Sequence, residues 1–233
     1  MNETHIDFFK KLSSIKPTET ESEFEQKQLQ RVIEGVNESA GIPRRFWNVS
    51  VSDYDFGFDV AEFATKPNND GVCLIVGNVG QGKTTMLCAA IHERAIKGLA
   101  AGYYMSNMTL DIRIRSLRSF SSKETEFDFF TKMSNIAFLC IDEVGTSDSP
   151  AEERKFLRKL LAARFDNMLP TMIATNLTNS QFKKFMLGID DLTEMSKEEL
   201  NERCKRDSLM DRLFSVVTAV TKAGNNSFRK VNK

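Results

Sequence analysis

The chain has 233 residues, of which 41% are hydrophobic and 27% are charged. This length allows one sizeable α/β domain with a smaller appendage, and the composition is ordinary for a globular protein. Basic and acidic residues balance at 32 each, so contact with nucleic acid would need a local patch rather than bulk positive charge. We find no secretory signal and no apolar run of membrane-spanning length, and we expect a cytoplasmic protein with no membrane partner.

Residues 1–40 are polar and slightly acidic, with two stretches of helical apolar spacing around a linker at 16–23. We expect a small helical N-terminal arm here and a main domain at 41–233. The arm could be a helical cap packed on that domain or a mobile segment that docks on a partner protein, and the residues favour neither. Residues 41–59 form an aromatic-rich lead-in of the kind that packs near a nucleotide base, with Trp47 expected in the core.

An apolar run at 72–76 precedes the pattern G-x-x-x-x-G-K-T, which is typical of a phosphate-binding loop. Its glycines let the backbone curl so that N–H groups point inward, and the following helix adds the positive end of its dipole. Lys83 can reach the β- and γ-phosphates, and the Thr84 hydroxyl can bind Mg²⁺. A plain glycine turn would not require Lys-Thr after the last glycine. We therefore predict ATP and Mg²⁺ as ligands of these loop residues: Gly77, Asn78, Val79, Gly80, Gln81, Gly82, Lys83, Thr84 and Thr85.

A basic amphipathic helix is expected at residues 109–119, after a short strand at 102–105. It carries Arg113, Arg115 and Arg118 among apolar residues. These arginines could lie on a solvated helix face, which is the default for charges on a helix. They could also follow the phosphates of single-stranded nucleic acid.

The apolar run at 136–141 ends in two carboxylates, Asp142 and Glu143. The run is long enough for a buried parallel strand, and the carboxyl ends of such strands carry ligand-binding groups in α/β sheets. Asp142 would hold Mg²⁺ through its water shell, and Glu143 would act as the general base on the attacking water. The pair could merely cap a helix, but the phosphate loop upstream disfavours that interpretation.

A helix is predicted at 150–168, followed by a buried strand at 170–174 whose polar tip is Asn176. An amide there can contact the γ-phosphate or the attacking water, or it can serve as a turn residue or helix N-cap. Residues 188–205 are expected to form a surface insertion with a short helix, before a last strand at 215–220. Five strands separated by helices predict a parallel sheet with helices on both faces.

The order of these landmarks resembles that of AAA+ ATPases, with Walker A at 77–84, Walker B at 138–143 and sensor 1 at Asn176. Further segments narrow the resemblance to DnaC-type helicase loaders and their relative, the IstB transposition ATPase. The resemblance covers about residues 41–230 and implies an AAA+ P-loop NTPase domain with little or no C-terminal lid. The segments that carry it are Gly41-Ile-Pro-Arg-Arg-Phe, Ile141-Asp-Glu-Val-Gly, Pro170-Thr-Met-Ile-Ala-Thr-Asn-Leu, Asp211-Arg-Leu and Ser227-Phe-Arg.

The resemblance also implies roles for residues outside the loop. Arg212 would be an arginine finger supplied to a neighbour's γ-phosphate, unless it forms a surface salt bridge with Asp211 or Asp207. Arg229 would sense the γ-phosphate in its own subunit. The helix with the three arginines falls where these proteins contact single-stranded DNA, and the arm at 1–40 falls where helicase loaders grip a hexameric replicative helicase of the DnaB type.

We therefore expect an ATP-dependent replicative helicase loader that self-associates on ATP and hydrolyses it within the assembly. The alternative is an IstB-like ATPase that regulates a transposase on duplex DNA. A nucleotide-gated scaffold without hydrolysis is a further rival. A metabolic kinase is a weaker one, because no small-molecule acceptor site is visible in the sequence.

Overall fold

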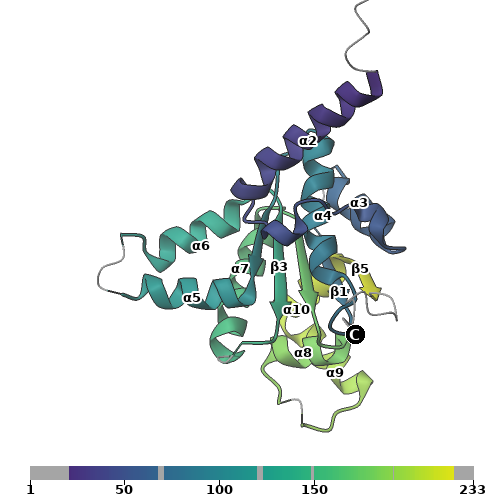
Figure 1. The fold of residues 1–233 in the computed structure, drawn as a ribbon. Coiled ribbons are helices and arrows are strands. Elements are labelled where there is room, and N and C mark those ends of the chain that lie inside the picture. The colour runs from purple at the N-terminus through teal and green to yellow at the C-terminus, as the bar shows by residue number, and fades with distance from the viewer. Residues whose placement is uncertain (1–20, 68–70, 120–122, 148–149, 191, 223–233) are drawn as a thin grey trace, which may run out of the picture.

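The computed structural model describes residues 21–67, 71–119, 123–147, 150–190 and 192–222. Its centre is a sheet of five parallel strands in the order β2-β3-β4-β1-β5 (Figure 1), as the sequence predicts. None of the described helices is both long and apolar enough to cross a membrane. The strands are β1 (Val72–Val76), β2 (Tyr103–Ser106), β3 (Leu139–Val144), β4 (Thr171–Thr175) and β5 (Val217–Lys222).

Helices cover both faces of the sheet, because successive strand residues point to opposite sides. In β1, Leu74 belongs to one apolar core and Cys73 and Ile75 belong to the other. The core that contains Cys73 and Ile75 is closed by α3 (Gly57–Thr65) and α4 (Lys83–Ile96). The core that contains Leu74 is closed by α5 (Asn107–Leu117), α6 (Glu126–Asn135), α7 (Pro150–Asp166), α8 (Asn179–Leu187), α9 (Lys197–Arg206) and α10 (Ser208–Val216).

Short polar signals set several helix ends. Ser106 caps the start of α5, accepting a hydrogen bond from the backbone of Thr109. Thr125, Thr178 and Ser196 begin α6, α8 and α9 with reciprocal capping boxes. Such a box satisfies two backbone donors that the first helical turn would otherwise leave without partners. The local sequence thus fixes where these helices begin.

The apolar run predicted as a strand from residue 136 is divided between two elements. Ile136 is the C-cap of α6, and β3 begins only at Leu139. Phe138 lies between them, fully buried, and its carbonyl accepts a hydrogen bond from Tyr103 N at 2.8 Å. Apolarity alone cannot separate a buried connection from a buried strand, which explains the shifted boundary.

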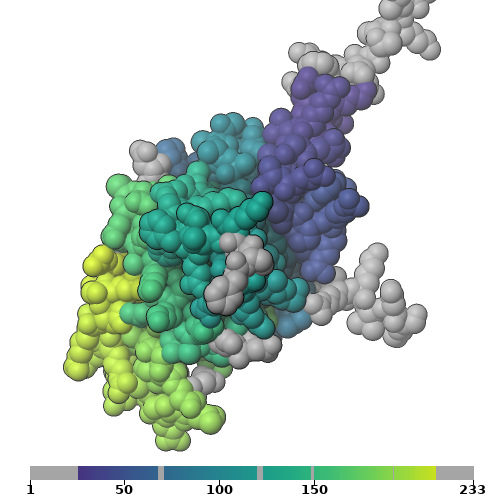
Figure 2. Space-filling model, turned by 90° about the vertical axis from the view of Figure 1, so that its left-hand side faces the viewer, coloured from purple at the N-terminus to yellow at the C-terminus, as the bar shows by residue number. Residues whose placement is uncertain are grey.

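The N-terminal helix α2 (Glu21–Ser39) projects from the body of the domain (Figures 1 and 2). Its C-terminal end is packed on α4, where Asn37 Oδ1 lies 2.8 Å from His92 Nε2. Further toward the projecting end, Leu29 and Val32 each remain 41% exposed. Residues 1–20 of the predicted arm lie outside the described residues. Two short 3-10 helices, η1 (Arg44–Phe46) and η2 (Val51–Asp53), connect α2 to α3.

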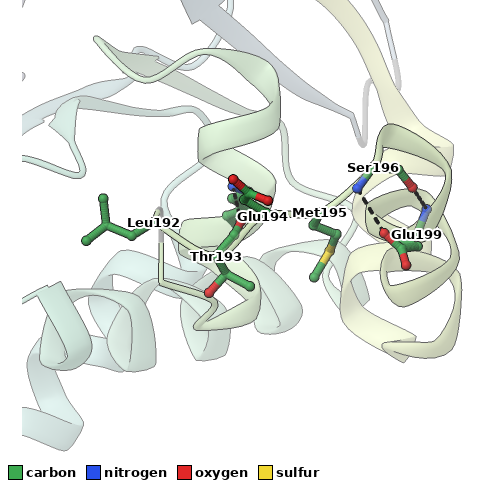
Figure 3. Close-up of a pocket in the computed structure, with 7 residues that line it drawn as sticks. Leu192, Thr193, Glu194, Met195, Ser196 and Glu199 are labelled. Atoms are coloured by element: carbon green, nitrogen blue, oxygen red, sulfur yellow. Dashed lines mark hydrogen bonds between the residues drawn. The ribbon is translucent and has the colours of Figure 1, made fainter.

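The insertion predicted at 188–205 joins α8 to α9 and includes most of α9, and Figure 3 shows the residues that line a pocket on it. An open pocket of about 580 Å³ lies on it. Ser196 and Glu199 form the capping box of α9 there, and Lys184 Nζ donates to the Thr193 carbonyl at 2.9 Å. These polar groups are therefore engaged in local structure. The pocket is lined by Lys184, Leu192, Thr193, Glu194, Met195, Ser196 and Glu199.

Candidate nucleotide site

The predicted phosphate loop connects the carboxyl end of β1 to the first turn of α4. Gly77 N donates to the Thr175 carbonyl at 3.3 Å, which ties the loop to the tip of β4. Gly80 and Gly82 have φ angles of 87° and 80°, in the left-handed region that favours glycine. A Cβ on Gly82 would lie only 2.3 Å from the Tyr54 ring. Both backbone conformation and packing therefore require glycine at position 82.

Two side chains of the loop form hydrogen bonds with its own backbone. Lys83 is 8% exposed, and its Nζ donates to the carbonyls of Gly77 at 2.8 Å and Asn78 at 2.7 Å. Gln81 is also buried, and its Oε1 accepts a hydrogen bond from Asn78 N at 2.5 Å. The loop is thus already curled, and the buried ammonium group of Lys83 lies along it. A curled glycine-rich loop that leads into a helix N-terminus is a common anion-binding arrangement.

Two hydroxyl groups converge on Asp142, which is 2% exposed. Thr84 Oγ1 donates to Asp142 Oδ2 at 2.6 Å, and the Tyr104 hydroxyl donates to the same oxygen at 3.0 Å. The other carboxylate oxygen accepts a hydrogen bond from Glu143 N at 2.9 Å. The structure therefore brings together Lys83, Thr84 and Asp142, which the sequence predicts as phosphate and Mg²⁺ ligands.

Glu143 lies at an irregularity in β3. The pairing of β3 with β4 shifts between Ile141 and Val144, so β3 contains one extra residue there. Glu143 has a φ of 59°, a left-handed conformation that is uncommon for a residue other than glycine. Bulges of this kind re-aim side chains beside functional sites. Here the Glu143 side chain is exposed, although it lies between the buried residues Asp142 and Val144.

Asn176 follows directly after β4, next to the tip of β3, and its side chain is exposed. The preceding residue, Thr175, is fully buried, and its hydroxyl donates to the Val144 carbonyl at 2.7 Å. This bond ties the tips of β3 and β4 together. Glu143, in the last residues of β3, and Asn176, just after β4, thus lie at the carboxyl ends of neighbouring strands.

A pocket of about 240 Å³ opens beside the loop. Phe46 and Tyr54, from the aromatic-rich lead-in, line it together with Arg45 and loop residues from Gly80 to Thr85. Trp47 packs against the core instead, and its Nε1 donates to the Ile42 carbonyl at 2.9 Å. The lead-in therefore supplies one wall of the pocket, and Trp47 is partly buried against the core and not among the residues that line the pocket.

Arg212 lies far from its own phosphate loop. Its guanidinium is 3.4 Å from Asp166 Oδ1 at the C-terminal end of α7, and that end leads into the amino end of β4. The loop is at the carboxyl ends of the strands, so the two lie at opposite ends of the sheet. The surface salt bridge expected as the alternative thus has Asp166 as its partner in the structure, and Asp207 pairs with Arg158 at 2.8 Å. Arg229 lies outside the described residues.

The three arginines of α5 are exposed and form ion pairs. Arg113 pairs with Glu124, Arg115 pairs with Asp111, and Arg118 pairs with Glu126 at 2.5 Å and Glu152 at 3.2 Å. The face of α5 and α6 is turned toward the viewer in Figure 2. Exposed pairs of this kind contribute about 0–1 kcal/mol each to stability.

Sequence reasoning missed a buried carboxyl beside the site. Glu153 of α7 is 5% exposed, and its Oε1 accepts a hydrogen bond from Gly145 N, two residues after Glu143, at 2.8 Å. Among the described residues, its Oε2 is buried without a hydrogen-bond partner. Burial raises the pKa of this carboxyl above its usual value, although its hydrogen bonds oppose the rise. An acidic residue in a first helical turn is common, so the sequence carries no distinguishing signal.

A parallel sheet in this order, with a phosphate loop after β1 and an acidic pair at the end of β3, defines a P-loop ATPase of the AAA+ type. The chain belongs to the family of IstB-like ATP-binding proteins, whose family model matches residues 58–233. It is therefore an ATP-binding protein and an ATPase. No functionally curated protein sequence matches the chain.

The fold is shared with several proteins of solved structure, among them DnaC, DnaI and DnaA. The DnaC helicase loader is 17% identical with a TM-score of 0.57, and the match covers 78% of this chain and 100% of that chain. DnaI is 18% identical with a TM-score of 0.56, over 78% of this chain and 95% of that chain. The initiator DnaA, bound to AMPPCP and single-stranded DNA, is 14% identical with a TM-score of 0.54, over 76% of this chain and 50% of that chain. At these identities the likeness shows the fold alone.

Proposed function

We propose that this chain is an ATP-dependent helicase loader of the DnaC type, which assembles on ATP and holds single-stranded DNA and a DnaB-type helicase. The dependence on ATP rests on one observation, the convergence of Lys83, Thr84 and Asp142 beside the glycines of the loop. A curled loop, a buried ammonium, and a hydroxyl next to a buried carboxylate fit a nucleoside triphosphate with Mg²⁺. When bound, Mg²⁺ neutralises charge on the phosphates.

In this proposal each residue has one task in the hydrolysis of ATP. Lys83 binds the β- and γ-phosphates, and Thr84 and Asp142 hold the magnesium ion. The exposed Glu143 carboxylate accepts the proton of the attacking water, and the Asn176 amide orients that water. The bulge in β3 supports the role of Glu143, because it turns this side chain outward from the strand.

The first test is nucleotide binding by Lys83→Ala. A fluorescent ATP analogue should bind the variant about 100-fold more weakly than the wild type, because a charge-assisted contact to phosphate is lost. Lys97→Ala, at the exposed far end of the same helix, is the matched control and should bind normally. Unchanged binding by Lys83→Ala would refute the site.

We propose that Arg212 acts on the nucleotide of a neighbouring subunit. Its position at the end of the sheet opposite its own loop supports a role in trans. Arg212→Ala should lower ATP hydrolysis per subunit by about 10³-fold or more, because an arginine finger contributes that much to the rate. Fluorescent-nucleotide binding should be unaffected. Equal hydrolysis by variant and wild type at high protein concentration would contradict the assignment.

We propose that the α5 arginines bind the phosphates of single-stranded DNA. The support is their exposure on one helix and the weakness of the pairs that hold them. Reversing all three charges to Glu should weaken binding and reduce the slope of log K against log salt by about 2, at roughly 0.7 per phosphate contact. Reversing the exposed Arg203, Lys205 and Arg206 of α9 to Glu changes the net charge by the same amount and is the control. An unchanged slope in the triple variant would leave these residues as an ordinary solvated face.

We propose that the projecting part of α2 docks on the helicase. Leu29 and Val32 support this, because they are large apolar side chains exposed on one helix. The double variant Leu29→Asp and Val32→Asp should lose capture of a DnaB-type helicase by the full chain. Gln26→Asp with Gln28→Asp adds the same charge to α2 and should retain capture. Retention by both double variants would exclude this docking surface.

The second candidate is a regulator of a transposase on duplex DNA, and the match to the IstB-like family favours it. The two candidates differ in the nucleic acid that they bind. Competition between single-stranded and duplex DNA of the same sequence, in the presence of ATP, separates them. Preference for the duplex, together with capture of a transposase rather than a helicase, would decide for the second candidate.

A further inference from the structure

Tyr104 contacts the acidic pair from a strand that sequence motifs do not single out. It lies in β2 and is 7% exposed. Its hydroxyl donates to Asp142 Oδ2 at 3.0 Å, the same oxygen that accepts the Thr84 hydroxyl at 2.6 Å. Three hydrogen bonds thus reach this carboxylate, from Thr84, from Tyr104 and from Glu143 N.

The sheet explains why this tyrosine reaches Asp142. β2 and β3 are parallel, and Tyr104 lies opposite Cys140 in the register. Asp142 is two residues beyond Cys140 and therefore on the same face of the sheet. A tyrosine side chain is long enough to bridge that offset. The preceding residue, Tyr103, packs with the core on the opposite face.

The hydroxyl of Tyr104 can act only as a donor to this carboxylate. It donates to Asp142 Oδ2 at 3.0 Å, and an ionised carboxylate has no proton to donate in return. A carboxylate with three donors is fixed in orientation, since rotation would break them together. If Thr84 turned its hydroxyl toward a cation, Tyr104 would still hold Oδ2 in place.

We propose that Tyr104 is a positioning residue for magnesium, which fixes the Asp142 carboxylate beside Thr84 before the nucleotide arrives. The inference rests on the proposed ATP·Mg²⁺ site and adds a residue to it. Groups that orient metal ligands typically change metal affinity by about 10–100-fold when they are removed. The effect should appear in the magnesium requirement and not in contacts between the loop and phosphate.

The test compares the full-length wild type with Tyr104→Phe and with the matched control Tyr103→Phe, which removes a hydroxyl from the other face of the same strand. Binding of a fluorescent ATP analogue is measured in EDTA and across a magnesium titration, well below the lowest melting temperature of the three proteins. Tyr104→Phe should need about 10-fold more magnesium for half-maximal binding. Its affinity in EDTA should equal that of the wild type, and Tyr103→Phe should match the wild type throughout.

Each other outcome identifies what is wrong. If the wild type binds with a clear magnesium dependence and Tyr104→Phe shows the same dependence, Tyr104 does not position the site. If Tyr104→Phe loses affinity equally in EDTA and in magnesium, the hydroxyl supports the fold of the pocket, and the inference is overturned. If the wild type itself fails to bind the analogue, the proposed function fails first and the inference fails with it.

Discussion

The two ends of the parallel sheet differ in how completely their polar groups are satisfied. At the amino end, the fully buried Arg164 makes four hydrogen bonds, to the Thr171 hydroxyl and to the carbonyls of Met133, Ile136 and Pro170, at 2.7–2.9 Å. At the carboxyl end, Glu153 Oε2 is buried without a partner among the described residues. Glu143 there has a left-handed backbone.

This difference separates a structural region from a candidate functional one. Backbone strain and unsatisfied polar atoms destabilise a protein, and they persist where a binding or catalytic task requires that geometry. The amino end joins α6, α7 and β4 around the hydrogen-bonded Arg164, and its own left-handed residue, Met168 with a φ of 55°, lies just after α7, where helices commonly end in that conformation. The contrast predicts that substitutions at the amino end destabilise the protein, whereas some at the carboxyl end stabilise it and impair the site.

The largest effect is expected for Arg164→Met. Burial lowers the pKa of Arg164 to about 10, so the guanidinium is still charged at neutral pH. Removing it leaves its buried acceptors without donors, and the free energy of unfolding should fall by about 3–5 kcal/mol. Denaturant unfolding measures the change, and Arg206→Met on the surface should stay within about 0.5 kcal/mol of the wild type. A fall in the free energy of unfolding of less than about 1 kcal/mol would contradict the structural role given to Arg164.

A smaller effect of opposite sign is expected for Glu153→Gln. Burial raises the pKa of Glu153 in the folded state, so the folded protein binds this proton more tightly than the unfolded chain does. Stability should therefore fall as the pH rises from about 4.3, the unfolded value, through the raised folded value. The neutral Gln side chain does not lose stability as the pH rises. Glu153→Gln should therefore be more stable than the wild type by about 1 kcal/mol at neutral pH and equally stable in acid.

Thermal unfolding at a series of pH values checks this prediction. The exposed neighbour Glu152 supplies the control, because Glu152→Gln should show no gain that grows with pH. A Glu153→Gln variant that is less stable than the wild type at neutral pH would mean that the charged carboxylate is needed to hold Gly145.

The smallest effect is expected for Glu143→Gly. A left-handed conformation disfavours side chains by about 1–2 kcal/mol, and the greater freedom of glycine in the unfolded chain offsets part of the relief. The net gain should be about 0.5 kcal/mol, whereas Glu143→Ala should gain nothing. Both variants should lose ATP hydrolysis. Equal stability of the Gly and Ala variants would show that the backbone at Glu143 is not strained.

Much of the fold follows from the sequence because β1, β3 and β4 are short apolar runs with a polar or glycine-containing tip. The predicted last strand at 215–220 starts later, at Val217, because α10 continues through Val216. The loop at 77–84 and the pair Asp142 and Glu143 could be placed at strand ends from this pattern alone. The start of β3 could not, because Phe138 is as apolar as the strand itself. Apolar periodicity predicts that a residue is buried, but it does not predict whether the backbone of that residue pairs with a neighbouring strand.

Parts of the site depend on contacts that no local pattern encodes. The bond from Tyr104 to Asp142 needs the register of β2 against β3, and the orphan oxygen of Glu153 needs the packing of α7. The pairing of Arg212 with Asp166 joins residues 46 positions apart. These contacts depend on the tertiary structure, whereas the sequence patterns of turns, helix caps and motifs span only a few residues.

The junction of α2 with α4 has a mechanical consequence. α2 has 19 residues and is therefore a rod roughly 28 Å long. Its base is held by Asn37 against His92, on the same helix that begins with Lys83. A tilt of about 10° at that base would swing the far end by roughly 5 Å. Movements too small to disturb the hydrophobic packing of α4 would thus become displacements of several ångströms at the far end of α2.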